Sequence, residues 1–171
     1  SGRTLQGVNA VAIGYNAGTN NQGSASIAIG FTAGENTQSD GGVAIGLYAA
    51  QHSQGASAIA IGSYAGQNTQ GQLSVAIGNQ AGQHTQGTNS VAIGYGAGNT
   101  NQSDNSIAIG NYAGGSTQSS RCIAIGINAG ATSQQTGAIA IGYGAGSNTQ
   151  GQHSVAISQW AGQAIQGPYT V

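Results

Sequence analysis

The sequence contains very little charge, a single cysteine and no methionine. Charged residues make up 3% of the 171 residues, and the formal net charge is −1. The charged side chains are Arg3, Arg121, Glu35, Asp40 and Asp104. Nucleic acids and anionic membranes are recognised through dense positive charge, which this chain lacks. We therefore expect neither of them among its partners.

Two further absences narrow the possibilities. No apolar run approaches the roughly 20 residues that a membrane-spanning helix requires. Cys122 has no second cysteine to pair with inside the chain, so the sequence leaves the redox compartment open. Low charge combined with 32 glycines is compatible with disorder. The strict repeat of the chain argues against disorder, because disordered polar tracts do not require fixed spacing.

A repeat of sixteen residues runs through the whole chain. A β-branched residue, Ala and Ile recur together ten times without insertion or deletion, and Gln always follows the Ile by nine residues. The repeated residues are Ile13, Ile29, Ile45, Ile61, Ile77, Ile93, Ile109, Ile125, Ile141 and Ile157, with Gln22, Gln38, Gln54, Gln70, Gln86, Gln102, Gln118, Gln134, Gln150 and Gln166. A fixed period in this range is the signature of stacked repeat architectures.

Both ends of the chain keep the phase of the repeat. Gln6 and Gly7 precede Gln22 and Gly23 by one period, and residues 170–171 match residues 154–155. Solenoids normally carry atypical capping repeats, and neither end shows one. We therefore expect a single repeat domain over residues 1–171, in phase from about residue 6, that is a fragment of a longer fibre.

Each repeat contains two extended segments and two turns. In residues 74–78, Ser-Val-Ala-Ile-Gly, the alternation has the period of a β-strand, with Val and Ile on one face and small residues on the other. An Ala-Gly pair follows two variable residues, and we expect its Gly to adopt a positive φ. The segment that ends in Gln reads as a second, shorter and more polar strand.

These features predict an all-β chain in which each repeat forms one coil of a parallel β-solenoid. Coils stacked at about 4.8 Å give a rise of roughly 48 Å over ten repeats. Stacked Gln amides can hydrogen-bond to one another along such a stack. Frequent Gly and paired β-branched residues oppose a helix. The period excludes both the calcium-binding nonapeptide roll and the hexapeptide helix.

The first segment of the repeat also predicts association between chains. Val, Ile and a few Ala are the side chains available to fill a narrow coil, yet both faces of the first segment are apolar or small. One face then needs a partner, and the spacing does not decide which face it is. We predict a homo-oligomer with these strands at its centre. The residues that we expect in the core and interface of this oligomer are Val75, Ile77, Val91, Ile93, Ile107, Ile109, Ile123 and Ile125.

The motif resembles that of a known family. Asn-Ser-Val-Ala-Ile-Gly at 89–94 and Asn-Ser-Ile-Ala-Ile-Gly at 105–110 are similar to the head repeat of the YadA-like trimeric autotransporter adhesins. The resemblance implies a left-handed parallel β-roll, a homotrimer and an extracellular, outer-membrane-anchored fibre that binds a host protein or glycan. The repeat departs from the family in having sixteen residues instead of about fourteen. Similar motifs also occur in phage and virus fibres, so a virion surface stays open.

No set of residues predicts catalysis, and we expect no enzyme, cofactor or metal. His52 and His84 share a phase two coils apart, roughly 10 Å by the coil rise, and His153 has another phase. Cys122 occupies a small-residue position and is expected to be buried. Asp40 and Asp104 share a phase but lie four coils apart, too far for a catalytic carboxylate pair.

Aromatic residues recur in the two variable positions after the first strand. They are Tyr15, Phe31, Tyr48, Tyr64, Tyr95, Tyr112, Tyr143 and Trp160. If exposed, they can contact a sugar or a protein receptor. The alternative is that they stack upon each other and cover the turn.

Three functions are compatible with the sequence. The first is an adhesive fibre head that attaches to host cells or matrix through many weak contacts. The second is an ice-binding face formed by Thr37, Thr69, Thr85, Thr117 and Thr149, although Asn, Ser and Ile interrupt that column. The third is a structural spacer or capsid appendage that binds nothing.

Overall fold

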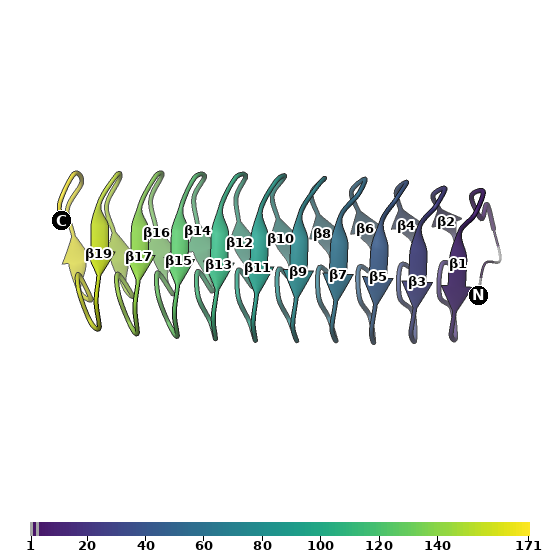
Figure 1. Cartoon of the computed structure of the whole chain (residues 1–171), viewed down its shortest axis with the longest axis horizontal. Coiled ribbons are helices and arrows are strands. Elements are labelled where there is room, and N and C mark those ends of the chain that lie inside the picture. The colour runs from purple at the N-terminus through teal and green to yellow at the C-terminus, as the bar shows by residue number, and fades with distance from the viewer. Residues whose placement is uncertain (1, 3) are drawn as a thin grey trace.

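The computed structural model describes residues 2 and 4–171, and these residues wind into coils stacked along a single axis (Figure 1). The two ends of the chain lie at opposite ends of the stack (Figure 1). Each coil contributes one strand of three residues and one strand of two residues. The chain is therefore a parallel β-solenoid with one sixteen-residue repeat per coil, as the period predicted.

The strands alternate between the two kinds along the chain. The three-residue strands are β1 Val11–Ile13, β3 Ile27–Ile29, β5 Val43–Ile45, β7 Ile59–Ile61, β9 Val75–Ile77, β11 Val91–Ile93, β13 Ile107–Ile109, β15 Ile123–Ile125, β17 Ile139–Ile141 and β19 Val155–Ile157. The two-residue strands are β2 Asn21–Gln22, β4 Thr37–Gln38, β6 Ser53–Gln54, β8 Thr69–Gln70, β10 Thr85–Gln86, β12 Asn101–Gln102, β14 Thr117–Gln118, β16 Ser133–Gln134, β18 Thr149–Gln150 and β20 Ile165–Gln166.

The described strands form two parallel sheets of ten strands each. The odd-numbered strands make one sheet and the even-numbered strands make the other, each in chain order. Every residue pairs with the residue sixteen positions away, as Ala76 does with Ala92. The register already holds near the start, where Gln6 bridges Gln22. Equivalent residues therefore form straight ladders along the axis.

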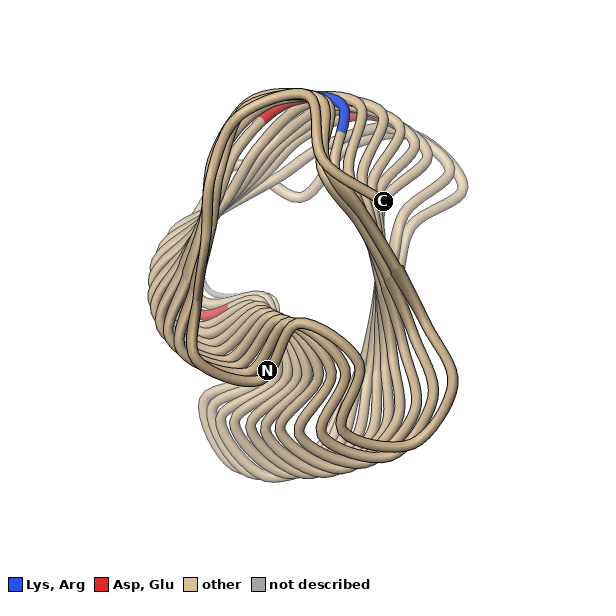
Figure 2. Ribbon diagram, turned by 90° about the vertical axis from the view of Figure 1, so that its left-hand side faces the viewer, with Lys and Arg blue, Asp and Glu red and all other residues tan. Residues whose placement is uncertain are grey.

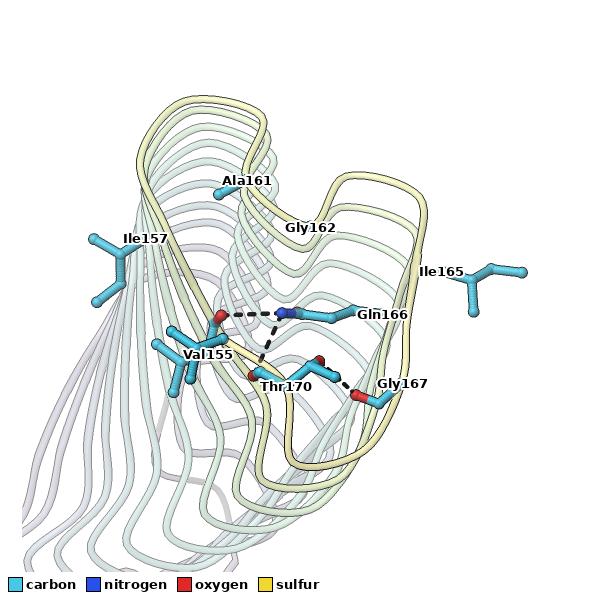
Figure 3. Close-up of a pocket in the computed structure, with 9 residues that line it drawn as sticks. Val155, Ile157, Ala161, Gly162, Ile165, Gln166, Gly167 and Thr170 are labelled. Carbon is cyan, nitrogen blue, oxygen red and sulfur yellow. Dashed lines mark hydrogen bonds between the residues drawn. The ribbon is translucent and has the colours of Figure 1, made fainter.

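Small and polar side chains fill the interior of the coil, so of the two faces that the spacing left open, the Ser/Ala face points inward. The central Ala of β9, Ala76, is 0% exposed, whereas Ile77 beside it is 37% exposed. The buried set consists of the strand Ala, the turn Ala, the Ser column and the Gln column. In the last coil Gln166 points into the interior, while Ile157 and Ile165 point away from it on opposite sides (Figure 3).

The buried Gln residues brace the two sheets against each other. Gln102 Nε2 donates to the carbonyl of Val91 at 2.8 Å, across the coil from β12 to β11. The nine other Gln residues from Gln22 to Gln166 make the same bond to the carbonyl eleven residues before them. Gln6, in the incomplete first coil, donates to the carbonyl of Ala10 instead. A buried amide is stable only when it is hydrogen-bonded, so these bonds are what allows a polar residue into the core.

The Gln side chains also bond to each other, as their fixed spacing predicted. Gln54 Nε2 donates to Gln70 Oε1 at 3.1 Å, and the run continues to Gln102. A second run extends from Gln118 to Gln150. The column is therefore two hydrogen-bonded ladders instead of one continuous ladder.

Two positions that glycine occupies in most coils have positive φ angles but different surroundings. Gly94 ends β11 with φ 122°, and a Cβ placed there would lie 2.8 Å from the carbonyl oxygen of Gly110 in the next coil. Gly98 has φ 54°, and its added Cβ would meet the flexible end of Gln102. Ala50 occupies the position equivalent to Gly98 with φ 45°. The first position thus excludes a side chain wherever another coil follows, and only Ser158 in the last coil departs from Gly there, whereas the second position accepts alanine within the stack.

This difference predicts unequal effects of the same substitution. Gly94→Ala should lower the free energy of unfolding by about 3 kcal/mol, because φ 122° is strained for alanine and its methyl group presses on backbone. Gly98→Ala should cost only about 1 kcal/mol. Urea denaturation followed by circular dichroism measures both. Equal effects of the two substitutions would contradict the steric argument.

Candidate functional site

The Val and Ile side chains of the odd-numbered strands form a continuous apolar face on the outside of the coil. Their exposure ranges from partial, as for Val91, to 59% for Ile157. The named residues Val75, Ile77, Val91, Ile93, Ile107, Ile109, Ile123 and Ile125 all lie on this Val/Ile face. Large exposed apolar patches on soluble proteins mark association surfaces. The outward face of the odd-numbered strands is therefore the Val/Ile face, since the small residues point inward.

The aromatic residues are both stacked and exposed. Tyr15 and Phe31 stack with ring centroids 5.1 Å apart, and Tyr48 and Tyr64 stack at 5.2 Å. Tyr95 with Tyr112, and Tyr143 with Trp160, make edge-to-face pairs. Six of the eight rings are more than 40% exposed, while Tyr48 and Tyr64 are half-buried.

Glycine positions create room for two of these rings. A Cβ on Gly96 would lie 2.7 Å from the ring of Tyr112, and a Cβ on Gly144 would meet Trp160. Each ring thus lies back over the preceding coil. An interaction with Tyr95, chiefly a hydrogen bond between side chains, raises the pKa of Tyr112. These contacts favour a role in covering the turn for the paired rings.

A second amide ladder runs along the outside of the coil. Gln51 Nε2 donates to Glu35 Oε2 at 2.9 Å, and Gln67, Gln83 and Asn99 continue the series toward the C-terminus. Its donors point toward the N-terminus, opposite to those of the buried ladder. The sequence analysis missed this ladder, although amide residues sixteen apart were a visible signal.

The histidines lie apart from one another. His52 Nδ1 contacts Asn36 Nδ2 at 3.0 Å, and His84 makes the same contact with Asn68. His153 stacks on Tyr169. Among the described residues, no group of three or more His, Cys, Asp or Glu side chains could hold a metal ion. The three histidines therefore serve local contacts on the surface.

Cys122 takes the place of a serine inside the coil, as expected. It is 0% exposed, and its Sγ contacts the carbonyl of Gln135 at 3.0 Å. Serines at equivalent positions donate similarly to main-chain carbonyls, as Ser90 does to Gly87 at 2.6 Å. Burial raises the pKa of the Cys122 thiol above its ordinary value.

We expect the raised thiol pKa to appear as an alkaline loss of stability. The folded state holds the proton more tightly than the unfolded state, so the free energy of unfolding should fall as the pH rises past the ordinary thiol pKa of about 8.5. Cys122→Ser should remove this decline and change stability at pH 7 by less than about 1 kcal/mol. Urea titrations of both proteins at pH 7 to 10 measure the effect, and parallel curves would contradict it.

The threonine column lies on the outer face of the even-numbered sheet. Thr37, Thr69, Thr85 and Thr117 are exposed, and Thr149 is half-buried. Adjacent Thr69 and Thr85 pair directly in register, while Ser53, Asn101, Ser133 and Ile165 interrupt the rest of the column. The column is thus regular in backbone spacing but mixed in chemistry.

Most of the charge gathers at one corner of the coil. Asp40, Asp104 and Arg121 lie in the turn that follows a two-residue strand, whereas Glu35 precedes one; Arg3 lies outside the described residues. In the view along the axis, acidic and basic positions lie together at this corner, with one acidic position elsewhere (Figure 2). Asp40 and Asp104 are not brought together, as expected from their spacing.

The fold and the sequence pattern together define a class. A parallel β-solenoid that stacks equivalent coils, with a Val/Ile face on one sheet, is a repeat protein. The family model described as the YadA head domain repeat (2 copies) matches residues 6–33, 70–97, 102–113 and 123–145, together more than half of the chain. The chain belongs to the YadA head-repeat family.

Membership of this family indicates a general class of function. The family is structural and adhesive rather than catalytic, and its heads are surface-exposed parts of outer-membrane autotransporters. Searches of curated proteins and of solved structures gave no match. Within the described residues, no helix has the length and hydropathy needed to cross a membrane.

Proposed function

We propose that the chain is a head segment of a trimeric adhesin, in which three copies pack through their Val/Ile faces and present the outer surfaces to a host cell or matrix. The observation that carries the proposal is the exposure of Val and Ile in every one of the odd-numbered strands. No other part of the described chain covers this face. A second and a third copy of the same chain would cover it with the same residues, which suits a closed symmetric assembly.

The geometry of the Val/Ile face supports self-association. All strands of the sheet have the same direction and a register offset of sixteen residues, so the face repeats regularly from coil to coil. Copies related by an axis along the solenoid can therefore make equivalent contacts along the whole length of the fibre. Adhesion by such a fibre would come from many weak, repeated contacts acting together.

Two measurements test the proposal. Light scattering at several concentrations should give a constant mass of three chains, and a constant mass of one chain would refute the trimer. Trimers immobilised on a surface should bind cultured host cells or matrix proteins above the level of an albumin control. Trimers that bind neither would instead be the spacer considered above.

The threonine column supports a second candidate function, ice binding. The observation that supports ice binding is the run of exposed side chains at the fixed spacing of a parallel sheet. A thermal-hysteresis assay at millimolar protein separates it from the first proposal. Absence of ice shaping would exclude it and leave the adhesive proposal unaffected.

A further inference from the structure

Two carboxylates are held in an identical way at the charged corner of the coil. Asp40 Oδ1 accepts a hydrogen bond from the main-chain nitrogen of Ser24 at 2.7 Å, and Asp104 Oδ1 accepts one from Thr88 at 2.7 Å. In both cases the donor belongs to the preceding coil. Each carboxylate is thus fixed by backbone although its side chain is exposed.

Glycine makes this placement possible at both positions. A Cβ on Gly23 would lie 2.8 Å from Asp40 Oδ1, and a Cβ on Gly87 would lie 2.5 Å from Asp104 Oδ1. Each aspartate therefore lies back over a glycine of the preceding coil. In the described part of the chain, the second oxygen of each carboxylate receives no protein hydrogen bond, so it is free to accept one from a ligand.

A hollow adjoins each carboxylate. The hollow at Asp104 has a volume of about 460 Å³, and the hollow at Asp40 has a volume of about 380 Å³. Thr85, Asn101 and Ser103 line the first beside Asp104. Asn21, Thr37 and Ser39 line the second beside Asp40. The same four residue types thus recur at equivalent positions, with Asn and Thr exchanged between adjacent coils; the hollows differ in that Ser120 lines the first where Ala56 lines the second.

The chemistry of these hollows selects a class of ligand. Hydroxyl and amide groups both donate and accept hydrogen bonds, and the fixed carboxylate oxygen accepts a strong one. This set suits a neutral molecule with several adjacent hydroxyl groups. An acidic sugar would face repulsion from the aspartate, most strongly at Asp40, because Arg121 adjoins Asp104 and its main-chain nitrogen donates to the Asp104 carbonyl at 3.1 Å. A calcium ion takes six to eight oxygen ligands, usually including several carboxylates, whereas each hollow offers one.

Other surfaces of the chain are less suited to such a ligand. The rings of the aromatic column stack upon one another. The outer amides from Gln51 to Asn99 already bond to one another. The Val/Ile face has no side-chain polar groups. The Asp40 and Asp104 hollows combine a fixed, unsatisfied acceptor with open space.

We propose that the Asp40 and Asp104 hollows are two equivalent binding sites for a neutral saccharide. This inference rests on the proposed function, because that function places the chain at a host surface. They are four coils apart, or about 19 Å at the usual strand spacing. A trimer carries six such sites. Shallow polar sites bind single sugars weakly, and binding to a surface bearing many saccharide chains gains strength from multivalency.

The test uses the full chain on a printed array of neutral oligosaccharides of galactose, N-acetylglucosamine, mannose and fucose, together with their sialylated counterparts. The protein should bind neutral structures in preference to sialylated ones. The Asp40→Asn and Asp104→Asn double variant should bind them about tenfold more weakly, because a hydrogen bond to a charged group is lost. The asparagine oxygen still accepts the main-chain bond, so the fold is kept.

Glu35→Gln is the matched control. It removes a negative charge at another corner, where Gln already occupies the equivalent position in four coils, and should bind like the parent chain. Unchanged binding by the double variant, binding to sialylated structures alone, or no binding to any saccharide would each overturn the inference. Host-cell adhesion that the double variant leaves intact would overturn it while the adhesive function stands. Saccharide binding without any adhesion to cells or matrix would overturn the adhesive function and leave the inference standing.

Discussion

Ile93→Asp should convert a trimer of this chain into monomers. Ile93 lies in β11 at the middle of the Val/Ile face. In the proposed trimer the substitution would bury one carboxylate from each chain without a partner, at a cost of several kcal/mol per charge. Light scattering should then report the mass of one chain in place of three. Cell binding that depends on multiple sites should fall with it.

Thr69→Asp is the matched control for this experiment. Thr69 is exposed on the outer face of β8, so the same charge is introduced where it stays in water. This variant should remain trimeric, and both variants should keep the β circular dichroism of the parent. A trimeric mass for Ile93→Asp would mean that another surface joins the chains.

Gln102→Leu should lower the free energy of unfolding by roughly 5 kcal/mol. The side chain donates to the carbonyls of Val91 and Ser106 and accepts a bond from Gln86. Leucine removes all three bonds and leaves buried groups unpaired, each costing about 1–3 kcal/mol. The loss should appear as a lower urea midpoint. It should also appear as faster hydrogen exchange in the coils around β12.

Gln83→Leu provides the comparison, because Gln83 makes its bonds to Gln67 and Asn99 in the outer ladder. Water can replace those bonds, so the expected loss is below about 1 kcal/mol. If the inner and outer substitutions proved equally mild, the buried glutamines would not brace the coil.

The architecture followed from the sequence because the repeat is strict. A period of sixteen residues without insertions leaves parallel stacking in register as the simplest way to place equivalent residues together, and alternation around Ala76 marked the strand. The orientation of that strand did not follow, since both of its faces are free of strongly polar residues. The answer depends on Gln102 reaching the carbonyl of Val91, a relation between positions eleven residues apart that no local pattern reveals.

The aromatic positions and the aspartates show the same limit. The sequence treated exposure and stacking of the rings as alternatives, yet Tyr95 and Tyr112 show both, because each ring covers part of its neighbour. The aspartate sites depend on Gly23 and Gly87 in the coil before each carboxylate. Because glycine is frequent throughout the chain, the sequence did not single out these two residues.

The one-way stacking of coils has a mechanical consequence. The hydrogen bonds between coils run along the fibre axis, and the two ends of the chain lie at opposite ends of the stack (Figure 1). Tension applied along the axis therefore loads every junction equally, and the end coils, which have only one neighbour, can detach singly. Each detached coil would release sixteen residues, or about 50 Å of extended chain in place of a rise of about 4.8 Å. A fibre built in this way can lengthen in small steps under flow while the coils still stacked keep their shape.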